Sequence, residues 1–144
     1  MAKSAPAIVL TFPAAADLSN YQFAPVTLDS NGQVTVASDN QISLGILQNK
    51  PKEGGAASVM VSGVSKAIAA QAITAPLTPL VSAGNGRVRP ASSYHTHTEN
   101  TAASYTQNAT TQPAQGGSFI IGYALRSASV AGEVIEVLLA PFRF

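Results

Sequence analysis

Two Asn-Gly dipeptides, each flanked by short alternating apolar runs, constrain the fold of this chain more than any other feature. Asn31-Gly32 separates the runs 26–28 and 34–36, and Asn85-Gly86 lies between Val81 and Val88. Asn-Gly readily adopts the positive φ angles of a tight hairpin turn, and alternating polarity is typical of half-buried strands. The pattern therefore predicts β-hairpins and argues against long helices.

Other short runs rich in β-branched residues predict strands at 42–46, 58–62, 119–125 and 134–139. The segment 65–73 stays open, because its alanines favour a helix whereas its isoleucines and short length allow a strand. A chain of 144 residues is the size of one domain. We expect an all-β fold, a compact β-barrel or β-sandwich-like single domain. Its predicted inward-facing residues are Val34, Val36, Leu44, Ile46, Val59, Val61, Ile121, Val137 and Leu139.

Two stretches of this pattern resemble each other and indicate an internal repeat. Each has a hairpin glycine, a strand glycine, a turn glycine and a closing strand: Gly32, Gly45, Gly54 and 59–61 in the first, Gly86, Gly122, Gly132 and 134–137 in the second. The first two glycines are 13 residues apart in one copy and 36 in the other, so 23 residues are inserted. Chance similarity between turn-rich sequences is the alternative.

Residues 1–16 are predicted to form an extended N-terminal arm, followed by the β domain at 17–144. An apolar run lies between Pro6 and Pro13, and prolines favour extended backbone. Such a segment can add as a strand to the sheet edge of another protein. The candidate contact residues are Ile8, Val9, Leu10 and Phe12. The equally weighted alternative is that this run is the first strand of the domain's own sheet.

Residues 91–117 are predicted to be a long polar loop, because they contain no aliphatic residue larger than alanine apart from proline. Within it, His95 and His97 would share one face of a strand, with Glu99 as the nearest third ligand. Two histidines alone are a weak metal signal, and we interpret them as exposed loop residues. We expect no metal site and no cofactor.

The chain is poor in charge. Only 10% of its residues are charged, against about 25% in an average soluble domain. A surface of Ser, Thr, Asn, Gln and Ala can pack against another protein without desolvating many ions, which favours an assembly protein. A secreted or highly soluble β domain would have the same composition.

Several classes of function find no support in the sequence. The eight basic residues are scattered, so we expect no nucleic acid partner. No apolar run approaches the roughly 20 residues needed to cross a bilayer, so no membrane contact is expected. The chain has no cysteine, no Gly-x-Ser-x-Gly elbow and no suggestive carboxylate pair. We therefore expect no catalytic residues and no enzyme.

Short motifs between Val26 and Leu139 resemble the bacteriophage head-decoration, or capsid cement, proteins. The segments that carry the similarity are 43–46, 54–63, 78–82, 120–125 and 131–139. The resemblance implies a β-barrel-like domain without a cofactor, a homotrimer at threefold or quasi-threefold positions of the capsid lattice, and an N-terminal arm that contacts the major capsid protein. The insertion at 91–117 departs from the compact pattern of the family.

The expected function is therefore structural: a decoration protein on the exterior of a phage capsid, made in the host cytoplasm, that stabilises the lattice of the head. The alternatives are another virion component, such as a tail or fibre protein, and a secreted carbohydrate-binding β module. Carbohydrate-binding modules usually present aromatic platforms, and this chain offers four tyrosines and no tryptophan.

Overall fold

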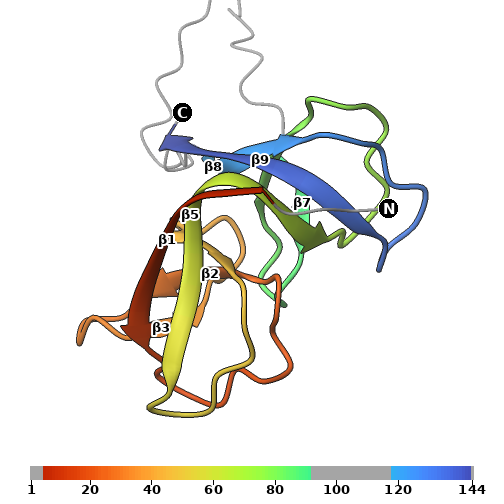
Figure 1. Ribbon diagram of the computed structural model, residues 1–144. Coiled ribbons are helices and arrows are strands. Elements are labelled where there is room, and N and C mark those ends of the chain that lie inside the picture. The colour runs from red at the N-terminus through yellow and green to blue at the C-terminus, as the bar shows by residue number, and fades with distance from the viewer. Residues whose placement is uncertain (1–4, 92–117, 144) are drawn as a thin grey trace, which may run out of the picture.

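The computed structural model describes residues 5–91 and 118–143, with side chains described for 8–91 and 118–140. Every helix-or-strand element in these ranges is a strand, which confirms the all-β prediction (Figure 1). The strands are β1 (Ala5–Pro13), β2 (Pro25–Leu28), β3 (Val34–Val36), β4 (Gly45–Leu47), β5 (Ala56–Ile68), β6 (Pro79–Ser82), β7 (Val88–Pro90), β8 (Phe119–Ala124) and β9 (Val134–Arg143). The described ranges hold no helix that could span a bilayer.

One antiparallel sheet contains all nine strands, in the order β3-β2-β4-β5-β9-β8-β6-β7, with β1 paired to β5. The 13-residue β5 lies in the middle of this order and joins the two halves of the sheet. Its first half pairs with β4 and β1, and its second half, from Gly63 to Ile68, pairs with β9. In Figure 1, β5 accordingly runs from the lower lobe beside β1 to the upper lobe beside β9.

The sheet consists of two similar halves that share β5. The N-terminal repeat (residues 5–62) contains β1 to β4 and the first half of β5, and the C-terminal repeat (residues 63–91 and 118–143) contains the rest of β5 and β6 to β9. Each half curls until its first strand reaches its own hairpin, through parallel bridges from Ala14 to Val34 and from Ala69 to Val88. The molecule is therefore one sheet curled twice, barrel-like in each half, rather than a sandwich of two sheets.

Hydrogen bonds recur at equivalent positions of the two repeats. Phe23 and Leu77, two non-glycine residues with left-handed φ angles of 67° and 65°, donate their N–H groups to Leu47 and Ala124 at 2.7 and 2.6 Å. Further N–H to C=O pairs that match are Ala14 to Gly55 with Ala69 to Glu133, Gly54 to Ala14 with Gly132 to Ala69, and Asp29 to Gln33 with Ala83 to Arg87. The predicted internal repeat is thus confirmed as a structural duplication.

The buried cores of the repeats also match. The seven buried residues of the N-terminal core each have a buried counterpart: Ala14 and Ala69, Leu18 and Ile73, Val26 and Leu80, Val34 and Val88, Leu47 and Ala124, Ala57 and Ile135, Val59 and Val137. The predicted inward-facing residues are all buried except Val36, Leu44 and Val61, which are half-buried against the N-terminal core. The alternation of apolar residues therefore identified the core correctly.

The repeat starts earlier than the sequence landmarks indicate. In the N-terminal repeat, β1 pairs with β5 from Val64 to Ala56. In the C-terminal repeat, the second half of β5 pairs with β9 at the equivalent positions. The second half of β5 is therefore the counterpart of β1. The open segment 65–73 begins as this strand and does not form a helix.

The N-terminal run expected as an arm forms β1, the other of the two interpretations that the sequence left open. Its backbone pairs with β5 from Ala5 opposite Val64 to Pro13 opposite Ala56, and Phe12 packs against the N-terminal core. Pairing within the sheet satisfies backbone groups that an unattached arm would leave to water. A boundary at residue 16 therefore does not separate this segment from the domain. Beyond Ala91, the predicted loop 91–117 lies outside the described residues.

Candidate interaction surface

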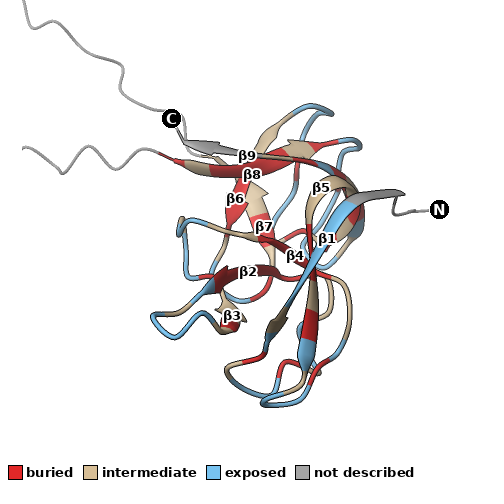
Figure 2. Cartoon of the chain, turned by 60° about the vertical axis from the view of Figure 1, so that its left-hand side comes forward, coloured by how far each residue is buried: buried red, intermediate tan, exposed pale blue. Residues whose placement is uncertain are grey.

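Three consecutive apolar side chains of β1 are exposed. Ile8 is 51% exposed, Val9 44% and Leu10 40%. Neighbours on a regular strand alternate between faces, so a core-facing residue would normally interrupt such a run. The register of β1 is irregular on both sides of Ile8. Val9 and Leu10 follow in regular register and point to opposite faces, so β1 is exposed on both faces at this point. Ile8, Val9 and Leu10 lie within the pale blue length of β1 in Figure 2, and we call these three residues the β1 strip.

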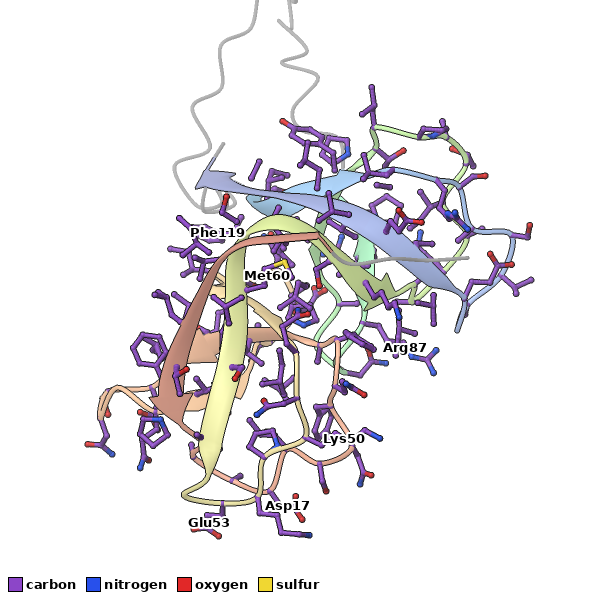
Figure 3. All side chains as sticks on the ribbon, viewed as in Figure 1. Asp17, Lys50, Glu53, Met60, Arg87 and Phe119 are labelled. Carbon is purple, nitrogen blue, oxygen red and sulfur yellow. The ribbon has the colours of Figure 1, made fainter. Side chains whose placement is uncertain are left out.

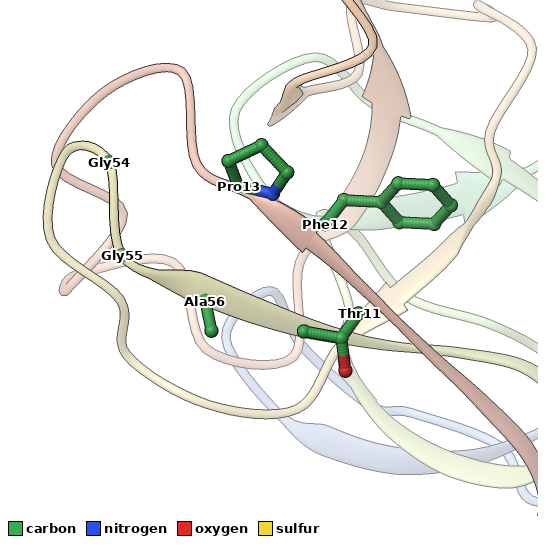
Figure 4. Close-up of a pocket in the computed structure, with 6 residues that line it drawn as sticks. All are labelled: Thr11, Phe12, Pro13, Gly54, Gly55 and Ala56. Atoms are coloured by element: carbon green, nitrogen blue, oxygen red, sulfur yellow. The ribbon is translucent and has the colours of Figure 1, made fainter.

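A shallow hollow lies where β1 ends beside the start of β5 (Figure 4). It has a volume of about 230 Å³ and is lined by Thr11, Phe12, Pro13, Gly54, Gly55 and Ala56. The lining carries one hydroxyl group and no titratable side chain. The hollow can therefore offer packing area and hydrogen bonds to a partner, but no group for acid–base chemistry.

The two repeats contact each other through a defined set of side chains. Phe23 and Met60 of the N-terminal repeat pack into the core of the C-terminal repeat, and Figure 3 shows Met60 between the two lobes. Gln48 donates from Nε2 to the Ser65 hydroxyl oxygen at 2.9 Å, and Lys66 Nζ lies 5.5 Å from the centroid of the Phe23 ring. The N-terminal repeat therefore covers the second half of β5.

A second contact joins the segment between β3 and β4 to the β6–β7 hairpin. Ser82 donates from Oγ to the carbonyl oxygen of Ala37 at 3.0 Å. Arg89 binds both carboxylate oxygens of Asp39, at 2.8 Å from Nε and 3.2 Å from Nη2. The hydrogen bond from Arg89 and, after it, the charge of Arg89 lower the pKa of Asp39 below its ordinary value of 3.8.

Replacing Asp39 with asparagine is expected to lower the melting temperature slightly at neutral pH and not at strongly acid pH. A depressed carboxylate pKa stabilises the fold above the ordinary value of 3.8, and this contribution is lost as the pH falls through the folded-state pKa. The Asp39 side chain is 60% exposed, so solvent screening limits the effect to about 1 kcal/mol or less. Thermal melts of the wild type and of the Asp39→Asn variant, from neutral to strongly acid pH, check the prediction. A difference that persists unchanged at low pH would contradict it.

Exposed apolar side chains also occur on the C-terminal repeat. Leu77 is 66% exposed, Leu125 38% and Leu138 40%. None of these leucines was predicted as a contact residue. The internal repeat could have indicated Leu125 as a contact residue. When the two repeats are aligned at Gly45 and Gly122, Leu125 takes the position of Gln48, which lies in the contact between the repeats.

The predicted contact residues are divided by the structure. Ile8, Val9 and Leu10 lie together on the β1 strip, whereas Phe12 is half-buried against the core. His95, His97 and Glu99 lie outside the described residues. Within 5–91 and 118–143, no three His, Asp or Glu side chains gather in a group that could hold a metal ion.

The sequence matches no family model and no curated protein. Among solved structures, the chain is similar to the head fiber gp8.5 N base of bacteriophage phi29, with a TM-score of 0.57 and 14% sequence identity. The alignment covers 95% of this chain and 97% of that chain. The two proteins share a fold. Because the likeness extends over nearly all of both chains, it includes both repeats.

Proposed function

We propose that this chain is a non-enzymatic structural protein of a phage particle that binds the outer surface of the capsid as a decoration protein. The similarity in fold to the phi29 head fiber base, over 95% of this chain, is the observation that carries the proposal. The sequence motifs that resemble decoration proteins support it separately. So does the low charge content of 10%, because a charge-poor surface is desolvated at small cost.

The proposed partners are the major capsid protein and further copies of this chain, in a homotrimer at threefold or quasi-threefold positions of the lattice. The resemblance to decoration proteins supports the threefold position. The exposed apolar side chains on both repeats support self-association, because contiguous exposed apolar area marks interaction surfaces.

A second candidate is the base of a head fibre, which the phi29 neighbour favours specifically. The two roles differ in what the head gains. A decoration protein stabilises the lattice against expansion and heat, whereas a fibre base anchors a projection without strengthening the shell.

Heads made without this protein are expected to lose density from their outer surface and to regain it when the purified chain is added. Cryo-electron microscopy of heads with and without the protein measures this, and heating the same heads separates the two roles. A lower disruption temperature that the added protein restores indicates decoration. Unchanged heat resistance with a lost projection indicates a fibre base. Identical head density with and without the protein would contradict both.

A further inference from the structure

The contact between the two repeats has two sides, each of which recurs once more in the chain. One side is the rear face of the N-terminal repeat, made by Phe23, Ile46, Gln48 and Met60. The other is the front strand of the C-terminal repeat, the second half of β5 with Ser65 and Lys66. Because the fold is a tandem duplication, the C-terminal repeat has its own rear face and the N-terminal repeat has its own front strand. Within residues 5–91 and 118–143, no further repeat lies against either of these two surfaces.

The rear face of the C-terminal repeat exposes three leucines, and its fourth residue, Tyr123, is half-buried. Its residues, at the positions equivalent to the four above, are Leu77, Tyr123, Leu125 and Leu138. Met60 is 1% exposed within the internal contact, whereas its counterpart Leu138 is 40% exposed. Phe23 is half-buried, and its counterpart Leu77 is 66% exposed. The same backbone positions are thus covered in one repeat and open in the other.

The front strand of the N-terminal repeat is β1. Ser65, which is fully buried in the internal contact, corresponds to Leu10, which is 40% exposed. Ser82, also fully buried there, corresponds to Leu28 on β2, which is 36% exposed. The β1 strip is therefore the counterpart of the surface on the second half of β5 that the N-terminal repeat covers.

The two open faces match each other in polarity at the position of the internal side-chain hydrogen bond. Inside the chain, Gln48 of the rear face hydrogen-bonds Ser65 of the front strand at 2.9 Å. The equivalent residues of the open faces are Leu125 and Leu10, which are both apolar. If only one of these faces carried a leucine, and the other kept the polar residue of the internal contact, the leucine would lie against a polar group. Leucine on both is what a contact between them requires, because an unpaired buried polar group is costly.

We propose that the rear face of the C-terminal repeat of one copy docks on the β1 strip of a second copy, and so repeats the internal contact between chains. The contact is head-to-tail, with different surfaces on the two partners. Such contacts close into a ring or grow into an open chain, and they do not form a twofold dimer. This inference identifies a specific self-contact and does not depend on capsid binding.

Designed disulfides test the contact directly, because the chain has no cysteine of its own. The variant with both Leu10→Cys and Leu125→Cys is expected to form disulfide-linked dimers and larger species on mild oxidation at high micromolar concentration. Each single variant should stay monomeric on a non-reducing gel, and an equal mixture of the two single variants should give dimers but nothing larger. The control pairs Leu10→Cys with Val130→Cys, a residue 59% exposed outside the rear face, and should not cross-link.

Two results would overturn the proposal. Disulfide dimers of either single variant would indicate a twofold contact, and absence of cross-links in the double variant would exclude the head-to-tail one.

A charge swap gives an independent measurement by sedimentation. Leu10→Lys and Leu125→Asp should each abolish association, and the variant that carries both substitutions should associate again. If the capsid protein covers the strip instead, Leu10→Lys would abolish binding to heads without changing the sedimentation of the free protein. Thermal melts confirm that each variant is folded.

Discussion

Replacing Gly122 with alanine is expected to lower the free energy of unfolding by about 3 kcal/mol, near the upper end of the range for overpacking a core. A Cβ atom at Gly122 would overlap the backbone carbonyl oxygen of Leu138 and lie 3.1 Å from the Leu139 Cα atom. Both are backbone atoms of β9, which is paired to β8 on one side and to β5 on the other. They cannot retreat without breaking a ladder, so the melting temperature should fall by about 10 °C.

Two further glycines serve as comparisons in the same denaturation experiment. Gly45→Ala should cost about as much as Gly122→Ala, because its Cβ atom would overlap the carbonyl oxygen of Met60 in the equivalent place. Gly132 has a φ of 91° and open space where a Cβ atom would stand. Gly132→Ala should therefore lower the free energy of unfolding only by the penalty for a side chain in the left-handed conformation, about 1–2 kcal/mol. Equal losses at Gly122 and Gly132 would show that crowding at β9 is not the cause.

Deleting residues 1–13 is expected to unfold the N-terminal repeat in the free protein. The deletion removes β1 and with it all pairing along the β5 edge from Ala56 to Val64. It also uncovers the core beside Phe12, whose own burial is worth about 1.5–3 kcal/mol at most. Since a whole domain is stable by only about 5–15 kcal/mol, loss of a complete edge strand exceeds what the repeat can tolerate. Loss of dispersion in the amide NMR spectrum measures this.

A matched variant separates folding from docking. Replacing Ile8, Val9 and Leu10 with threonine keeps a β-branched strand but makes the β1 strip polar. This variant should keep the spectrum and nearly the melting temperature of the wild type, and it should lose self-association. If the truncated protein instead folds normally and only loses attachment to heads, the segment acts as an arm and its pairing with β5 contributes little to stability.

The strands and the core could be predicted because their signals are local. Asn31-Gly32 and Asn85-Gly86 do make hairpin turns, with left-handed glycine φ angles of 73° and 79°. The alternation that singled out Val34 and Val59 reflects the two faces of a strand, so it correctly separated core from surface residues. The glycine landmarks revealed the duplication for the same reason, since each marks a backbone position that a side chain would strain or crowd.

The role of residues 5–13 could not be predicted in this way. An apolar run between two prolines is equally suited to its own sheet or to that of a partner, and the choice depends on which strand edge is open nearby. The edge of β5 from Ala56 to Val64 supplies that partner. Its pairing joins residues far apart in the sequence, and no local pattern at either segment records it.

The sequence by itself determined the turns, the strand faces and the duplication, because backbone preference and solvent transfer act on neighbouring residues. Only the tertiary structure decided which equivalent positions are covered. Gln48 and Ser65 meet inside the chain, whereas their counterparts Leu125 and Leu10 face solvent. In the described residues, the N-terminal repeat covers the front strand of the C-terminal repeat, and no described residue covers the equivalent surface of the N-terminal repeat in the same way. Exposure therefore follows from the order of the repeats in space, and not from the residues alone.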